Sequence, residues 1–384
     1  MDFALNEEQQ ALQKLAREFT AKEITPVAAH WDERGEVPME LIKKMHETGL
    51  MNIQIPEKYG GGGLGYLESC LVGEELAYGC TGISTTPMAH SLAITPILLA
   101  GTEEQKQKML KPICEEFGLA AFCLTEPGAG SDAGAVATTA RLDGDHYVIN
   151  GTKCFITNGS LARLYTVFAS EDRTKGLKGL SAFLVPAGPG VKAGKEEKKL
   201  GQRASNTTEV VFDDVRIPRA NLIGKSGEGF KIAMMTLDNA RAACAAAATG
   251  LSRRALDEAV RYSNERVQFG QPISAQQAIQ FILADMAMKV ETSRLMYLQA
   301  AWMTDQKMKQ TVQSAMAKCL CADTAMDVST MAIQVFGGYG YMKDYPVEKL
   351  MRDAKLMQIY EGTNQIQRVV IGRGLTAAAS RSKG

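Results

Sequence analysis

Apolar positions recur at helical spacing over the first part of the chain. Four of them follow one another at intervals of three or four residues, namely Leu12, Leu15, Ala16 and Phe19. Asn6 stands just before this run, where it can cap a helix. Similar runs, separated by glycine and proline breaks, predict further helices at 39–48, 67–78 and 103–116. We therefore expect residues 1–120 to form an N-terminal helical domain.

The pattern changes to that of strands between residues 121 and 225. Short runs rich in β-branched and aromatic residues occur at 147–149, 165–168, 182–185 and 210–212. Asp143-Gly144 and Asn150-Gly151 are dipeptides typical of hairpin turns. Because no long helical pattern separates these runs, we expect an antiparallel sheet or barrel.

Helical periodicity returns at residue 226 and continues to the end of the sequence. Three long helices are predicted, at 230–264, 275–305 and 309–336, and a shorter pair lies around Glu361. Long amphipathic helices joined by short loops are typical of a bundle. The chain is therefore expected to be an α+β multidomain protein, with a helical domain (1–120), a β domain (121–225) and a C-terminal helical bundle (226–384).

Composition narrows the classes of function. The 43 basic residues balance the 43 acidic ones, which argues against broad electrostatic binding to nucleic acid or to a membrane surface. The longest small-apolar run, at 242–248, is too short to span a bilayer. The N-terminus lacks the basic-then-apolar pattern of a signal peptide, so we expect a cytoplasmic protein.

Cysteine, histidine and glycine patterns exclude two common kinds of site. The eight cysteines and four histidines include no C-x-x-C pair and no H-E-x-x-H motif, so we expect buried, reduced thiols and no metal site. Residues 60–65 formally satisfy G-x-G-x-x-G, but no strand precedes them and the region near residue 85 offers no acid. A glycine turn is the better interpretation.

One carboxylate, Glu361, stands at a glycine-containing break between two apolar helical runs. Apolar surroundings raise the pKa of a carboxyl and make it a useful base near neutral pH. Most Glu-Gly pairs, however, are helix ends with a solvated side chain, and that interpretation stays open on local sequence alone. Glycine-rich stretches at 122–132 and 334–341 can approach a flat ring or a phosphate closely, or can simply be loops.

Five motifs, taken in order, make the chain resemble the acyl-CoA dehydrogenase family, most of all its medium- and short-chain members. They are CLTEPGAGSD at 123–132, FITNG at 155–159, ERVQFG at 265–270, QVFGG at 334–338 and YEGT at 360–363. The resemblance covers essentially the whole chain. It implies an N-terminal helical domain, a middle antiparallel β-barrel and a C-terminal four-helix bundle, with FAD between the domains and across a subunit interface of a homotetramer or homodimer.

The resemblance also implies roles for individual residues. Glu361 would remove the α-proton of an acyl-CoA thioester while a β-hydrogen leaves as hydride to flavin N5, and the Glu361 N–H and a flavin ribityl hydroxyl would polarise the thioester carbonyl. Arg266 would pair with the FAD pyrophosphate of a neighbouring subunit. FAD contacts are implied for Phe122, Leu124, Thr125, Gly130, Ser131, Phe155, Ile156, Thr157, Arg266, Phe269, Gln277, Gln334, Gly337, Gly338, Thr363, Asn364 and Gln365. Substrate contacts are implied for Ser131, Asp238, Arg241, Tyr360 and Gly362.

Two positions narrow the expected substrate. Some branched- and long-chain relatives carry the base at the position of Ala240, and glutaryl-type relatives carry an arginine near that of Ile83. Neither residue can serve these tasks here. We therefore expect dehydrogenation of a straight-chain, short- to medium-chain acyl-CoA, as in fatty acid β-oxidation, with electrons passed to an electron-transfer flavoprotein.

Alternatives remain open at this stage. The same scaffold can run in reverse as an enoyl-CoA reductase, can take a branched or cyclic acyl group, or can serve as a non-catalytic module that binds CoA or flavin. The sequence does not fix the acyl chain length, the direction, the pathway or the electron acceptor.

Overall fold

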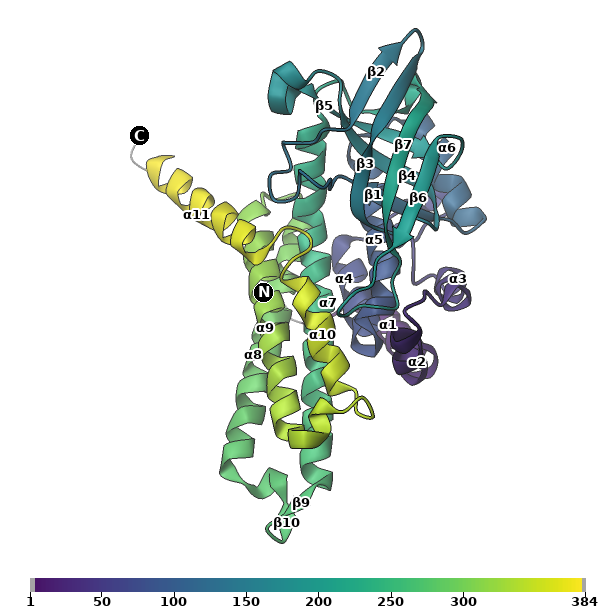
Figure 1. Cartoon of the computed structure of the whole chain (residues 1–384). Helices are drawn as coiled ribbons and strands as arrows, with labels where there is room; N and C mark the ends of the chain where they lie inside the picture. The colour runs from purple at the N-terminus through teal and green to yellow at the C-terminus, as the bar shows by residue number, and fades with distance from the viewer. Residues whose placement is uncertain (1–3, 382–384) are drawn as a thin grey trace.

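The computed structural model of the chain describes residues 4–381 and has three regions in sequence order. Helices come first, then a β-sheet, then helices again. Figure 1 shows the sheet at one end of the molecule and the C-terminal bundle at the other, with the N-terminal helices beside them. The 37-residue helix α7 (Gly229–Glu265) runs from the sheet to the far end of the bundle.

The first region contains the four predicted helices and two others. The α-helices are α1 (Glu7–Phe19), α2 (Ala28–Arg34), α3 (Met39–Glu47), α4 (Tyr66–Gly79), α5 (Thr81–Ala100) and α6 (Glu103–Glu115). Asn6 caps α1, as predicted, because its side chain accepts a hydrogen bond from Gln9 N at 2.8 Å. Within residues 4–381, α5 is the one helix long and apolar enough to cross a membrane, but 61% of that stretch is buried inside the protein.

The middle region is an eight-stranded, mostly antiparallel sheet. Its strands are β1 (Leu119–Cys123), β2 (Thr139–Asp143), β3 (His146–Thr157), β4 (Ala162–Ser170), β5 (Leu180–Pro186), β6 (Val191–Glu196), β7 (Thr207–Pro218) and β8 (Leu222–Ile223). They pair in the order β6-β7-β3-β2-β4-β5-β8, and β1 lies beside β4. The expected antiparallel pairing holds for the other strand pairs of this sheet, whereas β1 and β2 run parallel to β4.

The sheet curves round its own core. Tyr147 on β3 contacts Phe183 on β5, with ring centroids 4.8 Å apart, and Tyr165 on β4 contacts Phe212 on β7 at 6.1 Å. These strands are not neighbours in the sheet, so the rings meet across an enclosed interior. A flat sheet would hold them far apart, and the barrel-like middle domain is therefore confirmed.

One of the two predicted hairpin turns lies inside a strand instead. Asp143-Gly144 does begin the β2–β3 hairpin, with Gly144 at φ +65°. Asn150-Gly151, by contrast, lies inside β3, at a shift of register against β7. Gly151 is needed there because a Cβ atom would lie 2.3 Å from Thr138 Oγ1. The glycine admits a close neighbour rather than a chain reversal.

The C-terminal region is the predicted helical bundle. Besides α7 it contains α8 (Gln277–Asp305), α9 (Thr311–Phe336), α10 (Val347–Met357) and α11 (Asn364–Arg381). Small residues line its centre, and α7 contributes the buried Ala242 and Ala245 to Ala248. α11 leaves the bundle and projects away from the body of the chain (Figure 1). All eight cysteines are free and buried.

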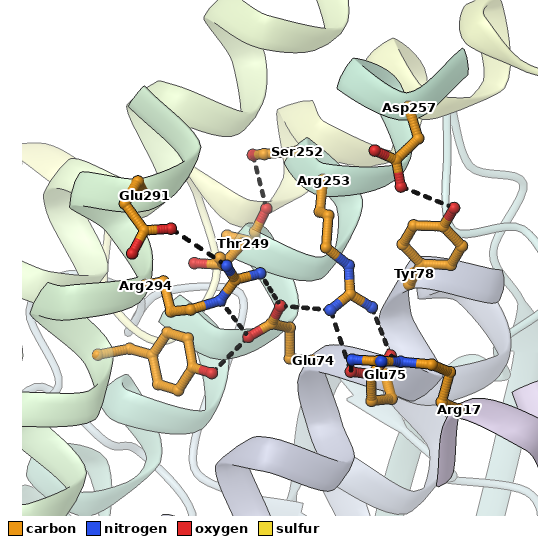
Figure 2. Close-up of polar contacts among 12 residues, drawn as sticks. Arg17, Glu74, Glu75, Tyr78, Thr249, Ser252, Arg253, Asp257, Glu291 and Arg294 are labelled. Carbon is orange, nitrogen blue, oxygen red and sulfur yellow. Dashed lines mark hydrogen bonds and ion pairs between the residues drawn. The ribbon is translucent and has the colours of Figure 1, made fainter. Parts of the chain in front are cut away.

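A buried charged cluster joins α4 to α7 and α8 (Figure 2). Glu74 has no exposed surface and accepts hydrogen bonds from Arg253 Nη1 at 2.8 Å and Arg294 Nη2 at 2.7 Å, and also from the Tyr297 hydroxyl. Beside it, Glu75 pairs with Arg253 and with Arg17 of α1. Each carboxylate is thus compensated by arginine, as a buried charge requires.

Candidate functional site

The connection between α10 and α11 carries Glu361 in an unusual backbone conformation. Glu361 has φ +55° and Gly362 has φ +86°. A non-glycine residue in this region is strained by on the order of 1 kcal/mol or more, and persists only where its surroundings hold it. The predicted glycine-containing break is therefore a fixed turn.

Side chains from α9 and α11 hold this turn from behind. Lys318 Nζ donates to the Gly362 carbonyl oxygen at 2.7 Å, and Gln367 Nε2 donates to the same oxygen at 2.9 Å and to the Glu361 carbonyl oxygen at 3.1 Å. Lys318 also donates to Asn364 Oδ1 at 2.9 Å. Among residues 4–381, the N–H groups of Glu361, Gly362 and Thr363 donate no hydrogen bond. The turn thus offers its donors to a bound molecule.

The carboxyl group of Glu361 is desolvated. Its Oε2 atom is buried and has no hydrogen-bond partner within the described part of the chain. Burial raises the pKa of Glu361 to about 7, against the opposing charges of Lys318 and Arg241. A carboxyl with this pKa is about half ionised at neutral pH, as a general base requires.

Glu361 lines a narrow pocket between the N-terminal helices and α7. The pocket volume is about 70 Å³. Its walls are mainly apolar and come from the 50–54 segment, α4, α5 and α7, with Val72, Leu76, Met88, Leu92, Ala240, Ala243 and Ala247 among the lining residues. One water needs about 10–15 Å³ in such a cavity, so roughly five to seven water-sized groups fit. The pocket has room for a short apolar chain beside the Glu361 side chain.

Arg241 and Asp238 lie in the α7 wall beside this pocket. The Arg241 guanidinium is buried and its Nη1 donates to Asp238 Oδ1 at 2.5 Å, while Asp238 Oδ2 accepts from Thr311 Oγ1 at 2.7 Å. Arg241 Nε has no partner within residues 4–381. Tyr360, also expected to contact substrate, carries a buried hydroxyl that likewise has no partner there.

The structure brings two of the expected flavin-contacting stretches together. Cys154 N donates to the Thr125 carbonyl oxygen at 2.9 Å, which joins the loop after β1 to β3. Phe155 follows on β3 with φ +57° and a side chain 68% exposed. An exposed aromatic ring on a strained residue is costly unless something covers it.

The same two stretches differ in which atoms they can offer to a ligand. Leu124 and Ile156 are buried in the protein core, so only their main-chain atoms are available. Thr125, Thr157 and Phe122 are partly buried, and Phe122 packs on Phe168 with centroids 5.0 Å apart. Gly130 and Ser131 are exposed, and a Cβ atom at Gly130 would meet nothing within 4 Å. This loop therefore borders open space.

A buried ion pair fixes the loop after β1. Lys153 Nζ, which has no exposed surface, donates to Glu126 Oε1 at 2.7 Å and to the Leu124 carbonyl oxygen at 3.2 Å. Glu126 in turn accepts from Thr138 N at 3.0 Å. The loop is therefore anchored to β3 by buried contacts, although several of its residues face outward.

A separate group of expected FAD contacts lies at the far end of α7. Arg266, Gly337 and Gly338 line a second cavity of about 470 Å³ together with Tyr262, Gln268 and Phe336. The Arg266 guanidinium lies over the Tyr339 ring at 5.3 Å from its centroid. Nearby are the exposed Gln277 and Gln334, and Phe269, which is 94% exposed.

This second group is remote from Glu361 within one chain. Arg241 and Arg266 are separated by 25 residues, almost all in the single helix α7, which at about 1.5 Å per residue corresponds to about 37 Å. The structure therefore does not bring all the expected cofactor contacts to one place in the monomer. Thr363, Asn364 and Gln365 belong with the Glu361 turn, where Asn364 is buried and Gln365 exposed.

Two residues that hold the turn were not singled out from the sequence. Lys318 is the charged residue in a run of small and apolar residues at 314–322, and a lysine on a buried helix face is a recognisable signal. Gln367 lies one turn into α11 and gives no such signal. Within residues 4–381, no group of three histidine, cysteine or acidic side chains is placed to hold a metal ion.

Family comparisons match all three regions of the chain. The description "Acyl-CoA dehydrogenase, N-terminal domain" matches residues 6–116, the middle domain of the same family matches 121–215, and its C-terminal domain matches 227–376.

Two curated relatives are similar over nearly their whole length. The chain is 48% identical over 373 residues to "Acyl-CoA dehydrogenase, short-chain specific" of Clostridium acetobutylicum, covering 97% of this chain and 98% of the relative. It is 47% identical over 376 residues to "Acryloyl-CoA reductase (NADH)" of Anaerotignum propionicum, covering 97% and 95%.

Two solved structures share the fold. Butyryl-CoA dehydrogenase from Megasphaera elsdenii is 46% identical with a TM-score of 0.96, over 98% of this chain and 100% of that one. A chain from a structure described as "Electron transferring flavoprotein of Acidaminococcus fermentans" is 50% identical, also with a TM-score of 0.96, over 98% and 99%.

Proposed function

The chain belongs to the acyl-CoA dehydrogenase family, as its five motifs predict, and we propose that it oxidises a short straight-chain acyl-CoA to the trans-2-enoyl-CoA. Its general activity is that of an oxidoreductase of this family, with FAD as cofactor. The single observation that carries the substrate proposal is the pocket of about 70 Å³ that Glu361 lines. Its small volume favours butyryl-sized acyl groups over long ones.

The residues present fit FAD. The exposed Phe155, the open Gly130 loop and the unpartnered N–H groups near Glu361 offer a surface for a flat ring and its polar atoms. When bound there, FAD would accept the hydride that leaves the substrate β-carbon. Arg266, Gly337 and Gly338 would hold the dinucleotide end, and their distance from Glu361 favours FAD shared between subunits.

The chain's own residues supply the proton chemistry. Glu361 takes the α-proton through its desolvated carboxyl, whose pKa of about 7 makes it strong enough as a base and still ionised at neutral pH. The free N–H of Glu361 lies in the same turn and can donate to the thioester oxygen as negative charge develops on it. The apolar walls exclude water and fix the acyl chain.

The relatives support a proposal for the electron acceptor and leave two candidate directions. The similar chain from the Acidaminococcus structure supports an electron-transfer flavoprotein as the acceptor. The acryloyl-CoA reductase relative favours a second candidate, reduction of a short enoyl-CoA by the reverse of the same steps. Neither the pocket nor Glu361 distinguishes the two directions, because both use the same proton and hydride positions.

Assembly into a homotetramer or homodimer in the cytoplasm is also proposed. Several large apolar side chains are strongly exposed in the monomer, among them Phe269, Tyr341, Phe281 and Met288. Such exposure supports the proposal that another subunit covers these surfaces. Light scattering of the purified protein would measure the mass directly.

A substrate panel tests the proposed function. The flavin absorption of the purified protein should bleach under anaerobic conditions when butyryl-CoA is added, more weakly with octanoyl-CoA, and not with isovaleryl- or glutaryl-CoA. Reoxidation by added crotonyl-CoA would establish how readily the reverse reaction runs. No bleaching with any straight-chain acyl-CoA would refute the assignment.

A further inference from the structure

Lys318 is a buried lysine without a carboxylate partner. It lies on α9 with no exposed surface, and within residues 4–381 no acidic side chain is within 4.0 Å of its ammonium. Its hydrogen bonds go to the neutral oxygens of Gly362 and Asn364. Removing an ammonium from water costs several kcal/mol unless an anion compensates it. The two hydrogen bonds alone therefore do not explain why a charged ammonium is buried at position 318.

The hydrogen bonds alone do not supply that reason. The Gly362 carbonyl already accepts from Gln367 Nε2 at 2.9 Å. Asn364 is held independently, since its Nδ2 donates to Asp323 Oδ1 at 2.7 Å and to the Cys319 carbonyl oxygen at 3.2 Å. A neutral donor, or no donor, at position 318 would leave the turn attached to α9 and α11.

The charged groups around Glu361 single out Lys318. From α7, Arg241 also faces the carboxyl, but its charge is paired with Asp238 at 2.5 Å. Cys244 of α7 and Tyr360 of the turn stay neutral because burial raises their pKa values, that of Cys244 to about 12. The pocket walls from α4, α5 and the 50–54 segment contribute no other charged side chain. Of the two cations that act on the Glu361 carboxyl, Lys318 is thus the one without a carboxylate partner among the described residues.

We propose that Lys318 is a positioning residue that acts on Glu361 through its charge: the hydrogen bond to the Gly362 carbonyl oxygen fixes the ammonium beside the Glu361–Gly362 turn, where its positive charge lets the buried carboxyl ionise. This rests on the proposed function, in which Glu361 is the base. Desolvation raises the pKa of Glu361. Without the Lys318 charge, only Arg241, which is paired with Asp238, would oppose that rise. The base would then stay protonated, and idle, at neutral pH.

The test measures the protonation of Glu361 directly in the flavin-loaded protein. Infrared difference spectra across a pH series follow its carboxyl band, which Glu361→Gln identifies by removing it. Lys318→Met removes the charge and the donor, and Lys318→Gln keeps a neutral donor. Lys355→Met, which removes an exposed lysine of α10, is the matched control.

The proposal predicts that both Lys318 variants raise the apparent pKa of Glu361 by about one to two units, while Lys355→Met leaves it unchanged. The value of kcat/KM should fall about fivefold or more at pH 7 and recover near pH 9. An unmoved pKa, or an equal loss of activity at both pH values, would overturn the proposal. Loss of folding in both variants would do the same, since it would make Lys318 a brace for stability.

The two hypotheses fail separately. If no acyl-CoA is turned over but the Lys318 variants still shift the titration of Glu361, the proposed substrate is wrong and the relation between the two residues stands. If turnover occurs but the titration does not move, the reaction stands and the role of Lys318 is refuted.

Discussion

Gln367 Nε2 lies 3.1 Å from the main-chain carbonyl oxygen of Glu361, while the carboxyl oxygen Oε2 of the same residue has no partner within the described chain. The backbone of Glu361 is thus fixed and its side chain is left available. Substitutions that change the Glu361 carboxyl should therefore alter the catalytic activity and leave the backbone conformation of the turn unchanged.

Glu361→Gln should abolish turnover and preserve the site. The amide has nearly the same shape but cannot accept the α-proton, so kcat should fall by about 10²–10⁴-fold or more. The flavin content and the affinity for the enoyl-CoA product should stay within a few-fold of wild type. Spectral titration with crotonyl-CoA checks the binding, and a variant that still turns over would place the base elsewhere.

The rate should depend on the ionisation of Glu361. Because the carboxylate is the reactive form and its pKa is about 7, kcat/KM should rise with pH through about 7 and level off above it. At pH 6 the reaction should run about tenfold slower than at pH 8, because with a pKa of about 7 the ionised fraction rises from about one tenth to about nine tenths between these pH values. A profile that is flat from pH 5.5 to 8 contradicts this assignment.

The same carboxyl should reduce stability at high pH. Its pKa is raised from an ordinary value of 4.5 to about 7, so between these values the native state binds more protons than the unfolded state and stability falls as pH rises. The full penalty, roughly 3 kcal/mol, applies above pH 7. Glu361→Gln has no carboxyl to ionise and so lacks this penalty. The difference between the Tm of the variant and that of the wild type should therefore increase as the pH rises from 4.5 to 8. A difference in Tm that is independent of pH would count against burial of an ionised Glu361.

Filling the pocket wall should shorten the preferred acyl chain. Ala243 of α7 lines the pocket, and Ala243→Leu adds bulk where the chain would lie. Each buried methylene contributes about 0.8 kcal/mol, so the kcat/KM ratio of hexanoyl-CoA to butyryl-CoA should drop about tenfold or more. Ala11→Leu, on the exposed face of α1, is the control and should leave the ratio unchanged. An unchanged ratio in Ala243→Leu would move the acyl site elsewhere.

The buried charged cluster should be the costliest place to remove an acid. Glu74→Ala leaves Arg253 and Arg294 without their shared carboxylate and should cost about 3–5 kcal/mol of unfolding free energy. Glu291→Ala removes an exposed partner of the same Arg294 and should cost less than about 1 kcal/mol. Urea unfolding of both variants measures the contrast, and equal losses would show that burial of Glu74 carries no special weight.

Much of the fold could be predicted because its elements are long and strongly periodic. The helices α7, α8 and α9 begin and end within two residues of their expected bounds. α5 was not predicted because Pro87 and Pro96 interrupt it and because it is apolar on nearly all sides, so it shows no helical alternation. The parallel pairing of β1 with β4 depends on contacts between distant segments, which a local pattern does not contain.

The residues of the candidate site likewise fall into those that the sequence could predict and those that only the folded structure reveals. Glu361 could be found because a carboxylate beside a glycine break is a local feature and belongs to a family motif. The support from Lys318 could not be found, because it depends on α9 lying against Gly362, 44 positions further along the chain. The pocket walls from α4 and from the 50–54 segment are likewise assembled only by folding.

The burial of all eight cysteines has a practical consequence for measuring motion. Burial raises the pKa of most of these thiols, which makes them slow to react with maleimides. A single cysteine introduced at Gly188, an exposed loop position where a Cβ atom meets nothing within 4 Å, would then be the preferred point of attachment for a fluorophore. The natural chain thus needs no prior removal of its own thiols before site-specific labelling.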